Sequence, residues 1–144
     1  MEEKINYKDI PKNYLFCNCK QCSRHSKCLR YQAMLAIPPE VPYYDSINPN
    51  YVKVKEKECD YFQPFYKSHF ACGIDNLLNN LTYSEAISVR KDLISLMGRS
   101  MFYRIRNKER LIHPLEQEQI ANVFLKNGIT SKPQFDKFID KYDW

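Results

Sequence analysis

The chain has 144 residues and a net charge of +5, with 44% hydrophobic and 27% charged residues. This length accommodates one domain with at most a small appendage, which excludes a multidomain enzyme, and the composition excludes a disordered chain. No stretch has the ~18 apolar residues of a membrane span, the first residues lack the pattern of a secretion signal, and three glycines are too few for a phosphate-binding loop. We therefore expect a cytoplasmic protein with neither a membrane nor a nucleotide as partner.

The first half of the chain predicts little regular structure. Its first 27 residues show no sustained periodicity, so something other than an apolar core must hold them in place. Good helix formers over residues 27–36 follow Ser26, a candidate N-cap, and precede Pro38, which predicts a short helix. Residues 51–55 alternate in the manner of a strand, and a second strand is expected near residues 66–71.

A capping box opens a helix in the second half of the chain, and a hairpin is expected after it. The hydroxyl of Thr82 and the carboxylate of Glu85 each satisfy a free backbone N–H, and Gly98 ends the helix. Residues 101–106 then alternate, and a turn leads into residues 110–112. This pattern predicts a β-hairpin with one basic face.

Two further helices are expected beyond the hairpin. Pro114 suits the first position of a helix capped by His113, and its apolar stripe extends to Gly128. Ser131 then caps a last helix, in which apolar residues follow the i, i+3, i+4, i+7 spacing of one face. Trp144 is expected to pack rather than fray. The residues of the apolar face are Phe135, Phe138, Ile139 and Tyr142.

Together these elements predict an α+β protein. Residues 1–72 are expected to form a cysteine-rich, metal-pinned lobe with a short helix and a strand. Residues 73–144 are expected to form a core of helix, β-hairpin, helix and helix. We expect the two parts to form one compact unit.

Basic residues are concentrated in two segments. Residues 10–39 hold five basic side chains and no acidic one, and residues 90–110 hold seven basic side chains and two acidic ones. Such patches are candidate surfaces for nucleic acid, although solvation, or thiolate neutralisation in the first segment, also explains them. On the expected hairpin Arg104 and Arg106 would project from one face about 7 Å apart, close to the spacing of phosphates. The residues assigned to this weak, sequence-independent contact are Arg99, Arg104, Arg106, Lys108 and Arg110.

Four of the six cysteines fall within twelve residues, and two more follow at Cys59 and Cys72. In a reducing cytoplasm such a cluster indicates metal binding rather than disulfides. The tight Cys19-x2-Cys22 spacing and the wider Cys17-x4-Cys22-x5-Cys28 spacing are both compatible with a metal site, so the choice between Cys17 and Cys19 stays open.

Zinc is the metal that the cysteine pattern favours. A tetrahedral zinc site would bring four sulfurs to about 3.5–4 Å from one another. A [4Fe–4S] cluster also takes four cysteines and is the first alternative, and free thiols without a metal are the second. His25 lies between two polar residues and is expected to be solvated rather than a ligand.

Several segments match the pattern of a known family. They are Cys17-x4-Cys22-x5-Cys28-Leu29-Arg30, Cys59-x2-Phe62-x-Pro64, and a series from Gly98-Arg99 through Phe102-Tyr103-Arg104, Gln117, Phe124, Gly128 and Phe135-Asp136 to Tyr142-Asp143-Trp144. By these segments, which cover nearly the whole chain, the protein resembles an uncharacterised domain-of-unknown-function family of short proteins from gut anaerobic bacteria. The resemblance implies that Cys17, Cys22, Cys28 and Cys59 are the family's cysteine positions, and it implies no activity, substrate or partner.

Catalytic motifs are missing from the sequence. The three histidines have no companions of the H-E-x-x-H kind, and Cys72 with His69 lacks a third, orienting group. We therefore assign no catalytic residue and expect a non-catalytic zinc-binding module that contacts a protein or a nucleic acid. The alternative is an iron–sulfur or thiol redox accessory protein, which a band near 400 nm would reveal.

Overall fold

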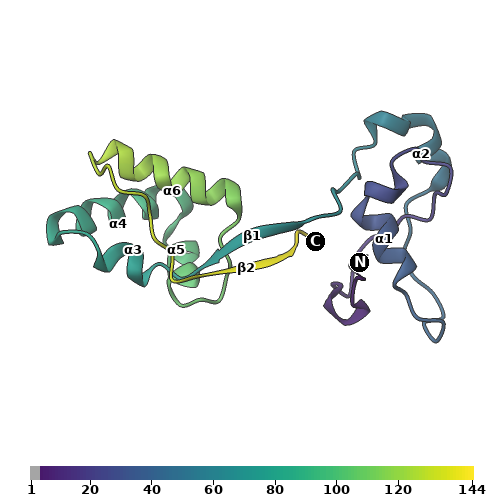
Figure 1. Ribbon diagram of the computed structural model, residues 1–144, viewed down its shortest axis with the longest axis horizontal. Helices are drawn as coiled ribbons and strands as arrows, with labels where there is room; N and C mark the ends of the chain where they lie inside the picture. Colours follow the sequence, from purple (N-terminus) through teal and green to yellow (C-terminus); the bar gives the residue numbers. More distant parts are fainter. Residues whose placement is uncertain (1–3) are drawn as a thin grey trace. The chain divides into compact units, whose positions relative to one another are not determined.

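The computed structural model describes residues 4–144 and divides them into two compact units. Unit 1 extends to Tyr66 and regains Tyr142–Trp144, whereas unit 2 is Lys67–Lys141. Figure 1 shows helices in both units and one pair of strands, β1 and β2. The expected α+β class is confirmed in this coarse sense, as helices with a small two-stranded sheet.

Unit 1 consists of short helices joined by irregular chain. The helix expected over residues 27–36 is confirmed as α1, but Cys28 rather than Ser26 precedes its first residue. Ser26 lies within a preceding 3-10 helix, where the chain has already turned, so it is not the cap. The α-helices of unit 1 are α1 (Leu29–Leu35) and α2 (Pro49–Lys55), and its 3-10 helices are η1 (Tyr7–Asp9), η2 (His25–Lys27) and η3 (Glu56–Glu58).

The strand expected at residues 51–55 is wrong, because these residues form the second half of α2. The side chain of Asn48 accepts a hydrogen bond from the backbone N–H of Asn50 at 3.0 Å, and Pro49 occupies the first helical position. Val52 is 1% exposed whereas Val54 is 82% exposed, so the alternating valines do not share a buried strand face. The local start signal therefore outweighs the alternation.

Two small apolar clusters form the interior of unit 1. One contains Tyr14, with Trp144 packed against it at a ring separation of 5.0 Å, which confirms that Trp144 packs. The other cluster includes the buried thiols of Cys17 and Cys19 beside Val52. Residues 142–144 are therefore part of the interior of unit 1.

Unit 2 contains the longest helices, and both capping predictions are confirmed there. Thr82 and Glu85 exchange hydrogen bonds of 3.3 and 3.0 Å at the start of α4. His113 caps α6 by accepting from the N–H of Leu115 at 3.2 Å, with Pro114 at the first position. The elements of unit 2 are β1 (Lys67–Cys72), α3 (Asp75–Asn79), α4 (Tyr83–Met97), α5 (Arg99–Arg106), α6 (Pro114–Lys126) and β2 (Lys137–Tyr142), whose last residue belongs to unit 1.

The β-hairpin expected over residues 101–112 is wrong, because residues 99–106 form helix α5. Phe102 and Ile105 are almost fully buried, and their spacing of three fits a helical face as well as the alternation fitted a strand. The expected turn ends this helix: Lys108 takes a left-handed conformation (φ 63°), and the N–H of Glu109 donates to the carbonyl of Arg104 at 2.9 Å.

The last predicted helix is also wrong, because residues 137–142 form strand β2. Phe138 is 46% exposed and Ile139 37%, so the two central members of the predicted apolar stripe do not face a core. β2 instead pairs with β1, which confirms the strand expected near residues 66–71, and the two run in opposite directions (Figure 1). Cross-strand contacts support the pair, since His69 stacks on Phe138 and contacts the carboxylate of Asp140 at 2.6 Å.

The interior of unit 2 is one continuous apolar cluster, to which β1 and the helices α3, α4, α5 and α6 contribute side chains. An antiparallel bridge between Ala71 and Ile112 fixes the chain that enters α6 against β1. Within residues 4–144, no helix combines the length and the apolar character that a membrane span requires. The buried members of the cluster are Ala71, Ile74, Leu77, Val89, Leu93, Phe102, Ile105, Ile112, Ile120, Val123, Phe124 and Ile129.

Candidate metal centre

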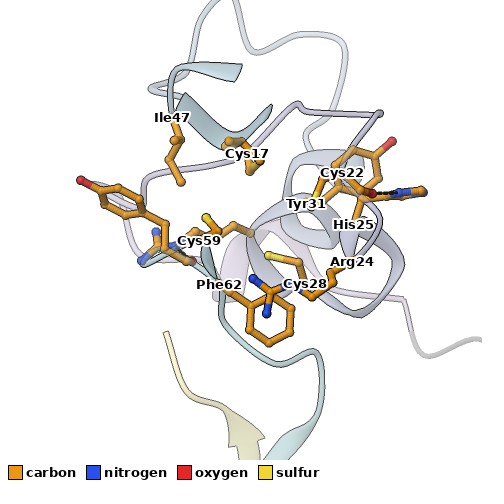
Figure 2. Close-up of a pocket in the computed structure, with 12 residues that line it drawn as sticks. Cys17, Cys22, Arg24, His25, Cys28, Tyr31, Ile47, Cys59 and Phe62 are labelled. Carbon is orange, nitrogen blue, oxygen red and sulfur yellow. Dashed lines mark hydrogen bonds between the residues drawn. The ribbon is translucent and has the colours of Figure 1, made fainter. Parts of the chain in front are cut away.

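Four of the six cysteines line one small cavity in unit 1. Cys17, Cys22, Cys28 and Cys59 surround a space of about 20 Å³, and Figure 2 shows them distributed around it rather than on one side. All four are free thiols; Cys17 and Cys28 are buried, and the other two are half-buried. A cavity of this size holds about one particle as large as a water molecule.

Backbone hydrogen bonds bring these cysteines together from distant parts of the sequence. The turn between Cys22 and Cys28 is closed by His25, whose N–H donates to the carbonyl of Cys22 and whose carbonyl accepts from Cys28, both at 3.2 Å. The segment after Cys59 is held beside Cys28 by a bridge to Pro64, with flanking N–H···O bonds of 2.7 and 2.9 Å. Main-chain pairing therefore positions Cys59 opposite the first cysteine segment.

The four thiols do not adopt a coordination geometry as they stand. Within residues 4–144, no three cysteine, histidine, aspartate or glutamate side chains are arranged to hold a metal ion. The expected spacing of about 3.5–4 Å between all four sulfurs is thus not seen in the described chain. The structure does place the side chains of all four cysteines around one cavity.

Burial and neighbouring charge both act on these thiols. Burial raises the pKa of Cys17 above its ordinary value; a hydrogen bond with the backbone of Cys19 acts in the opposite direction, and the thiols of Cys28, Cys19 and Cys22 raise the pKa further. Each of these sulfurs therefore lies within electrostatic reach of Cys17. A thiolate at this position requires a compensating positive charge.

Two arginines line the same cavity. Arg24 lies over the ring of Phe62, with its guanidinium carbon 4.2 Å from the ring centroid. Arg30 donates to the backbone carbonyl of Tyr61 at 2.8 Å and to that of Leu15 at 2.6 Å, so it ties the two cysteine segments together. Positive charge is therefore fixed at the cavity wall.

A model of a family of unknown function, DUF6078, matches residues 1–144. The chain belongs to the DUF6078 family. No curated protein and no solved structure matches it. For this DUF6078 protein, any functional argument must therefore come from its own residues.

The alternate ligand Cys19, the sixth cysteine Cys72 and His25 differ in how they relate to the cavity. Cys19 is 3% exposed within an apolar cluster and does not line the cavity, and Cys72 ends β1 in unit 2. His25 lines the cavity, but its Nδ1 contacts the carbonyl oxygen of Cys22 at 2.7 Å. Of the two alternatives Cys17 and Cys19, only Cys17 lines the cavity.

The five predicted nucleic-acid residues do not share the face of a strand. Lys108 is 3.6 Å from the carboxylate of Asp136, and Arg110 pairs with Glu116 through two hydrogen bonds of 2.8 and 3.0 Å. The other three, Arg99, Arg104 and Arg106, belong to α5. The side-by-side arrangement expected for Arg104 and Arg106 is wrong. Residues i and i+2 share a face in a strand, but in a helix they point in nearly opposite directions.

Sequence reasoning missed two groups of residues. The sequence patterns give Arg30 no structural role, although its hydrogen bonds to the carbonyls of Leu15 and Tyr61 join the two segments that carry the cavity cysteines. In unit 2, Arg90 was not assigned, yet it donates to the hydroxyl of Tyr103 at 2.5 Å. Both contacts join residues more than ten positions apart, so no local pattern signals them.

Proposed function

We propose that the protein is a non-catalytic zinc-binding module in which Cys17, Cys22, Cys28 and Cys59 hold one Zn²⁺ that stabilises unit 1. The shared cavity carries the proposal, because thiols up to 42 positions apart in the sequence line one space of about 20 Å³. A single ion fits a cavity of this size, and four thiolates are a common donor set of structural zinc. Bound there, Zn²⁺ would cross-link two segments that share little apolar core.

The sulfur atoms must turn inward to bind the ion. Since the four side chains already surround one cavity, rotation about their Cα–Cβ bonds can direct the sulfurs to its centre while the backbone pairing stays in place. Metal binding of this kind is coupled to local folding, so part of the binding free energy stabilises unit 1.

Charge around the cavity also supports a tetrathiolate site. Four thiolates around Zn²⁺ carry a net charge of −2, which is unfavourable in a partly buried position without counter-charge. Arg24 and Arg30 line the cavity and offset that charge. A metal site would thus account for two of the five basic residues in the run over residues 10–39.

An iron–sulfur or thiol redox role is the second candidate, because four cysteines also satisfy a [4Fe–4S] cluster. A cube of four irons and four sulfides is much larger than a single ion, and a cavity of about 20 Å³ would have to expand to hold it. Zinc is favoured on this ground.

A binding role rather than catalysis fits the histidines, each of which has a structural contact. His25 contacts a carbonyl oxygen within its turn, His69 contacts Asp140, and His113 caps α6. His69 and Cys72 are three positions apart on β1 and point to opposite faces of the strand, which disfavours them as a catalytic pair. Six unpaired cysteines are typical of a reducing compartment, so we place the protein in the cytoplasm.

Metal analysis of the full chain, purified anaerobically with its thiols reduced, tests the proposal. We expect one zinc per chain and no absorbance band near 400 nm. Replacing Cys17, Cys22, Cys28 or Cys59 with serine should each reduce the zinc content strongly. The matched controls Cys19→Ser and Cys72→Ser should retain it, because neither thiol lines the cavity.

Three outcomes would contradict the proposal. A brown protein with iron and sulfide would establish the cluster instead. Loss of zinc in Cys19→Ser but not in Cys17→Ser would exchange the two ligands. A zinc-free protein that gains none when ZnCl₂ is added under reducing conditions would show that the cavity binds no metal.

A further inference from the structure

Two arginines from neighbouring helices of unit 2 converge on one tyrosine. Arg90 of α4 donates to the hydroxyl of Tyr103 on α5 at 2.5 Å, and its guanidinium carbon is 5.9 Å from the ring centroid. The guanidinium carbon of Arg99 is 5.8 Å from the same centroid. The two positive charges are therefore held no more than about 12 Å apart.

The same face of α5 carries a third cation. Arg99, Tyr103 and Arg106 follow the i, i+4, i+7 spacing of one helix face, and the arginines lie about 10 Å apart along the axis by helix geometry. We refer to Arg90, Arg99, Tyr103 and Arg106 as the α4–α5 basic surface. All three arginines are exposed.

This surface lacks neutralising acids. Within residues 4–144, no acidic side chain forms an ion pair with Arg90, Arg99 or Arg106, whereas Lys108, Arg110 and Lys126 each have an acidic partner. The hydrogen bond from Arg90 lowers the pKa of Tyr103; burial acts in the opposite direction, and the charges of Arg90 and Arg99 lower the pKa further. Like charges fixed together without counter-charge repel one another, and an external anion relieves that repulsion.

We propose that the α4–α5 basic surface binds the phosphate backbone of a single-stranded nucleic acid. Each of the three guanidiniums can contact one phosphate of a flexible single strand, and guanidinium forks suit phosphate oxygens. An aromatic ring for base stacking lies beside them: Tyr83 is 84% exposed and precedes Arg90 by two helical turns on the same face of α4.

The chemistry of this face favours nucleic acid over a membrane. Helices that lie in a membrane interface bury a broad apolar face. Beside Arg90 on this face of α4, the large exposed apolar side chains are only Tyr83 and Ile87. The surface thus offers cations and an isolated ring, the combination that suits a single strand. It lies in unit 2 and does not depend on the zinc proposed for unit 1.

Fluorescence polarisation with a labelled 20-nucleotide oligothymidylate tests the proposal on the full chain. For about three phosphates the affinity should fall roughly 20-fold between 50 and 200 mM NaCl. The double variant Arg90→Glu/Arg99→Glu should bind at least tenfold more weakly at 50 mM. The control Lys132→Glu/Lys137→Glu, which makes the same change of charge at exposed positions of unit 2, should change affinity less than threefold.

Further variants separate surface chemistry from folding. Arg90→Lys/Arg99→Lys keeps the charge and should retain most of the binding, and Tyr83→Ala should weaken it about fivefold or more through lost stacking. Both should keep the thermal unfolding curve of the wild type. Chelation with EDTA should leave binding unchanged, so failure of the zinc proposal and failure of this one are distinguishable.

Four results would overturn the proposal. The first three are no wild-type binding at 50 mM NaCl, equal weakening in the test and control variants, and loss of binding on chelation. The fourth is displacement of the oligonucleotide by phosphatidylserine vesicles at a lower concentration than by unlabelled oligonucleotide. The last result would assign the surface to an anionic membrane.

Discussion

Units 1 and 2 contain comparable numbers of residues but are stabilised differently. Unit 2 has twelve buried apolar side chains in one cluster, and its helices α4 and α6 have 15 and 13 residues with capping boxes. The two clusters of unit 1 have only four buried members each, and α1 and α2 have seven residues each. Helices this short are marginal on their own, and small units with little core depend on cross-links or metals.

This comparison suggests that the cysteines contribute to the stability of unit 1. Two of the four buried members of one unit 1 cluster are cysteines, whereas the cluster of unit 2 contains none. A metal placed among these thiols would supply the cross-link that the apolar interior of unit 1 lacks. Unit 2 requires nothing of the kind.

Removing the proposed metal should produce the largest difference in stability between the two units. Chelation, or Cys28→Ser, should abolish the amide protection of unit 1 and leave α4 and α6 protected, because structural zinc contributes about 10 kcal/mol or more to the segments it joins. Hydrogen exchange read by mass spectrometry resolves the two units. The Cys19→Ser variant serves as a control. Simultaneous loss of protection in both units would mean that they unfold as one.

The converse experiment removes the core of unit 2. Phe102 is 0% exposed and is the largest fully buried side chain, so Phe102→Ala should cost about 3–5 kcal/mol, while Leu115→Ala at an exposed position should cost under about 0.5 kcal/mol. Urea unfolding followed by circular dichroism measures both. Zinc content should stay at one per chain. If zinc were lost together with unit 2, the independence of unit 1 would be disproved.

A smaller loss of stability is expected at the start of α3, which is capped by a side chain from outside that helix. The carboxylate of Asp136 accepts from the N–H groups of Asn76 and Asp75 at 2.7 and 3.3 Å, at the start of α3. Asp136→Ala should destabilise unit 2 by about 1–3 kcal/mol. Gly73→Ala should act in the same direction, because its Cβ would lie 2.2 Å from the Asp136 carboxylate and its φ is +84°.

The control for this cap is Asp140→Ala, at a side chain that is 64% exposed, which should change stability little. Thermal unfolding measures all three variants. Equal destabilisation by the Asp136 and Asp140 substitutions would contradict a capping role.

The smallest expected effect is a pH dependence confined to unit 2. Burial raises the pKa of Glu116, but hydrogen bonds from Arg110 and from the N–H of His113 outweigh it, so the pKa lies below its usual 4.5. The charged form is thus favoured in the folded state. Its contribution is present above about pH 4.5 and disappears as the pH falls through the lowered pKa.

Comparing Glu116→Gln with the wild type isolates this contribution. At pH 7 the variant should be less stable by about 0.5–1 kcal/mol, and the difference should shrink towards pH 3. Urea unfolding at pH 7, 5 and 3 measures it. A difference that does not change with pH would assign the loss to shape rather than charge.

Local signals explain which elements the sequence could predict. The helices that begin at Thr82 and His113 carry their own caps within three residues, so their starts needed no knowledge of the fold. Residues 101–106 fit both an alternating strand and a helix with Phe102 and Ile105 inward. Only the core they meet decides between the two.

Strand β2 and the candidate site depend on partners far away in the sequence. Phe135, Phe138 and Ile139 have helical spacing, yet pairing with β1 draws the chain into a strand. The cysteine spacing identified a set of candidate ligands, but the choice between Cys17 and Cys19 rests on which one faces the cavity. No local pattern specifies that orientation.

The position of Trp144 affects the order in which the protein can fold during synthesis. The interior of unit 1 combines residues that lie on both sides of unit 2 in the sequence, and residues 142–144 are translated only after the whole of unit 2. The contact between Tyr14 and Trp144 therefore cannot form until the whole of unit 2 has been translated, so the interior of unit 1 is completed only at the end of synthesis.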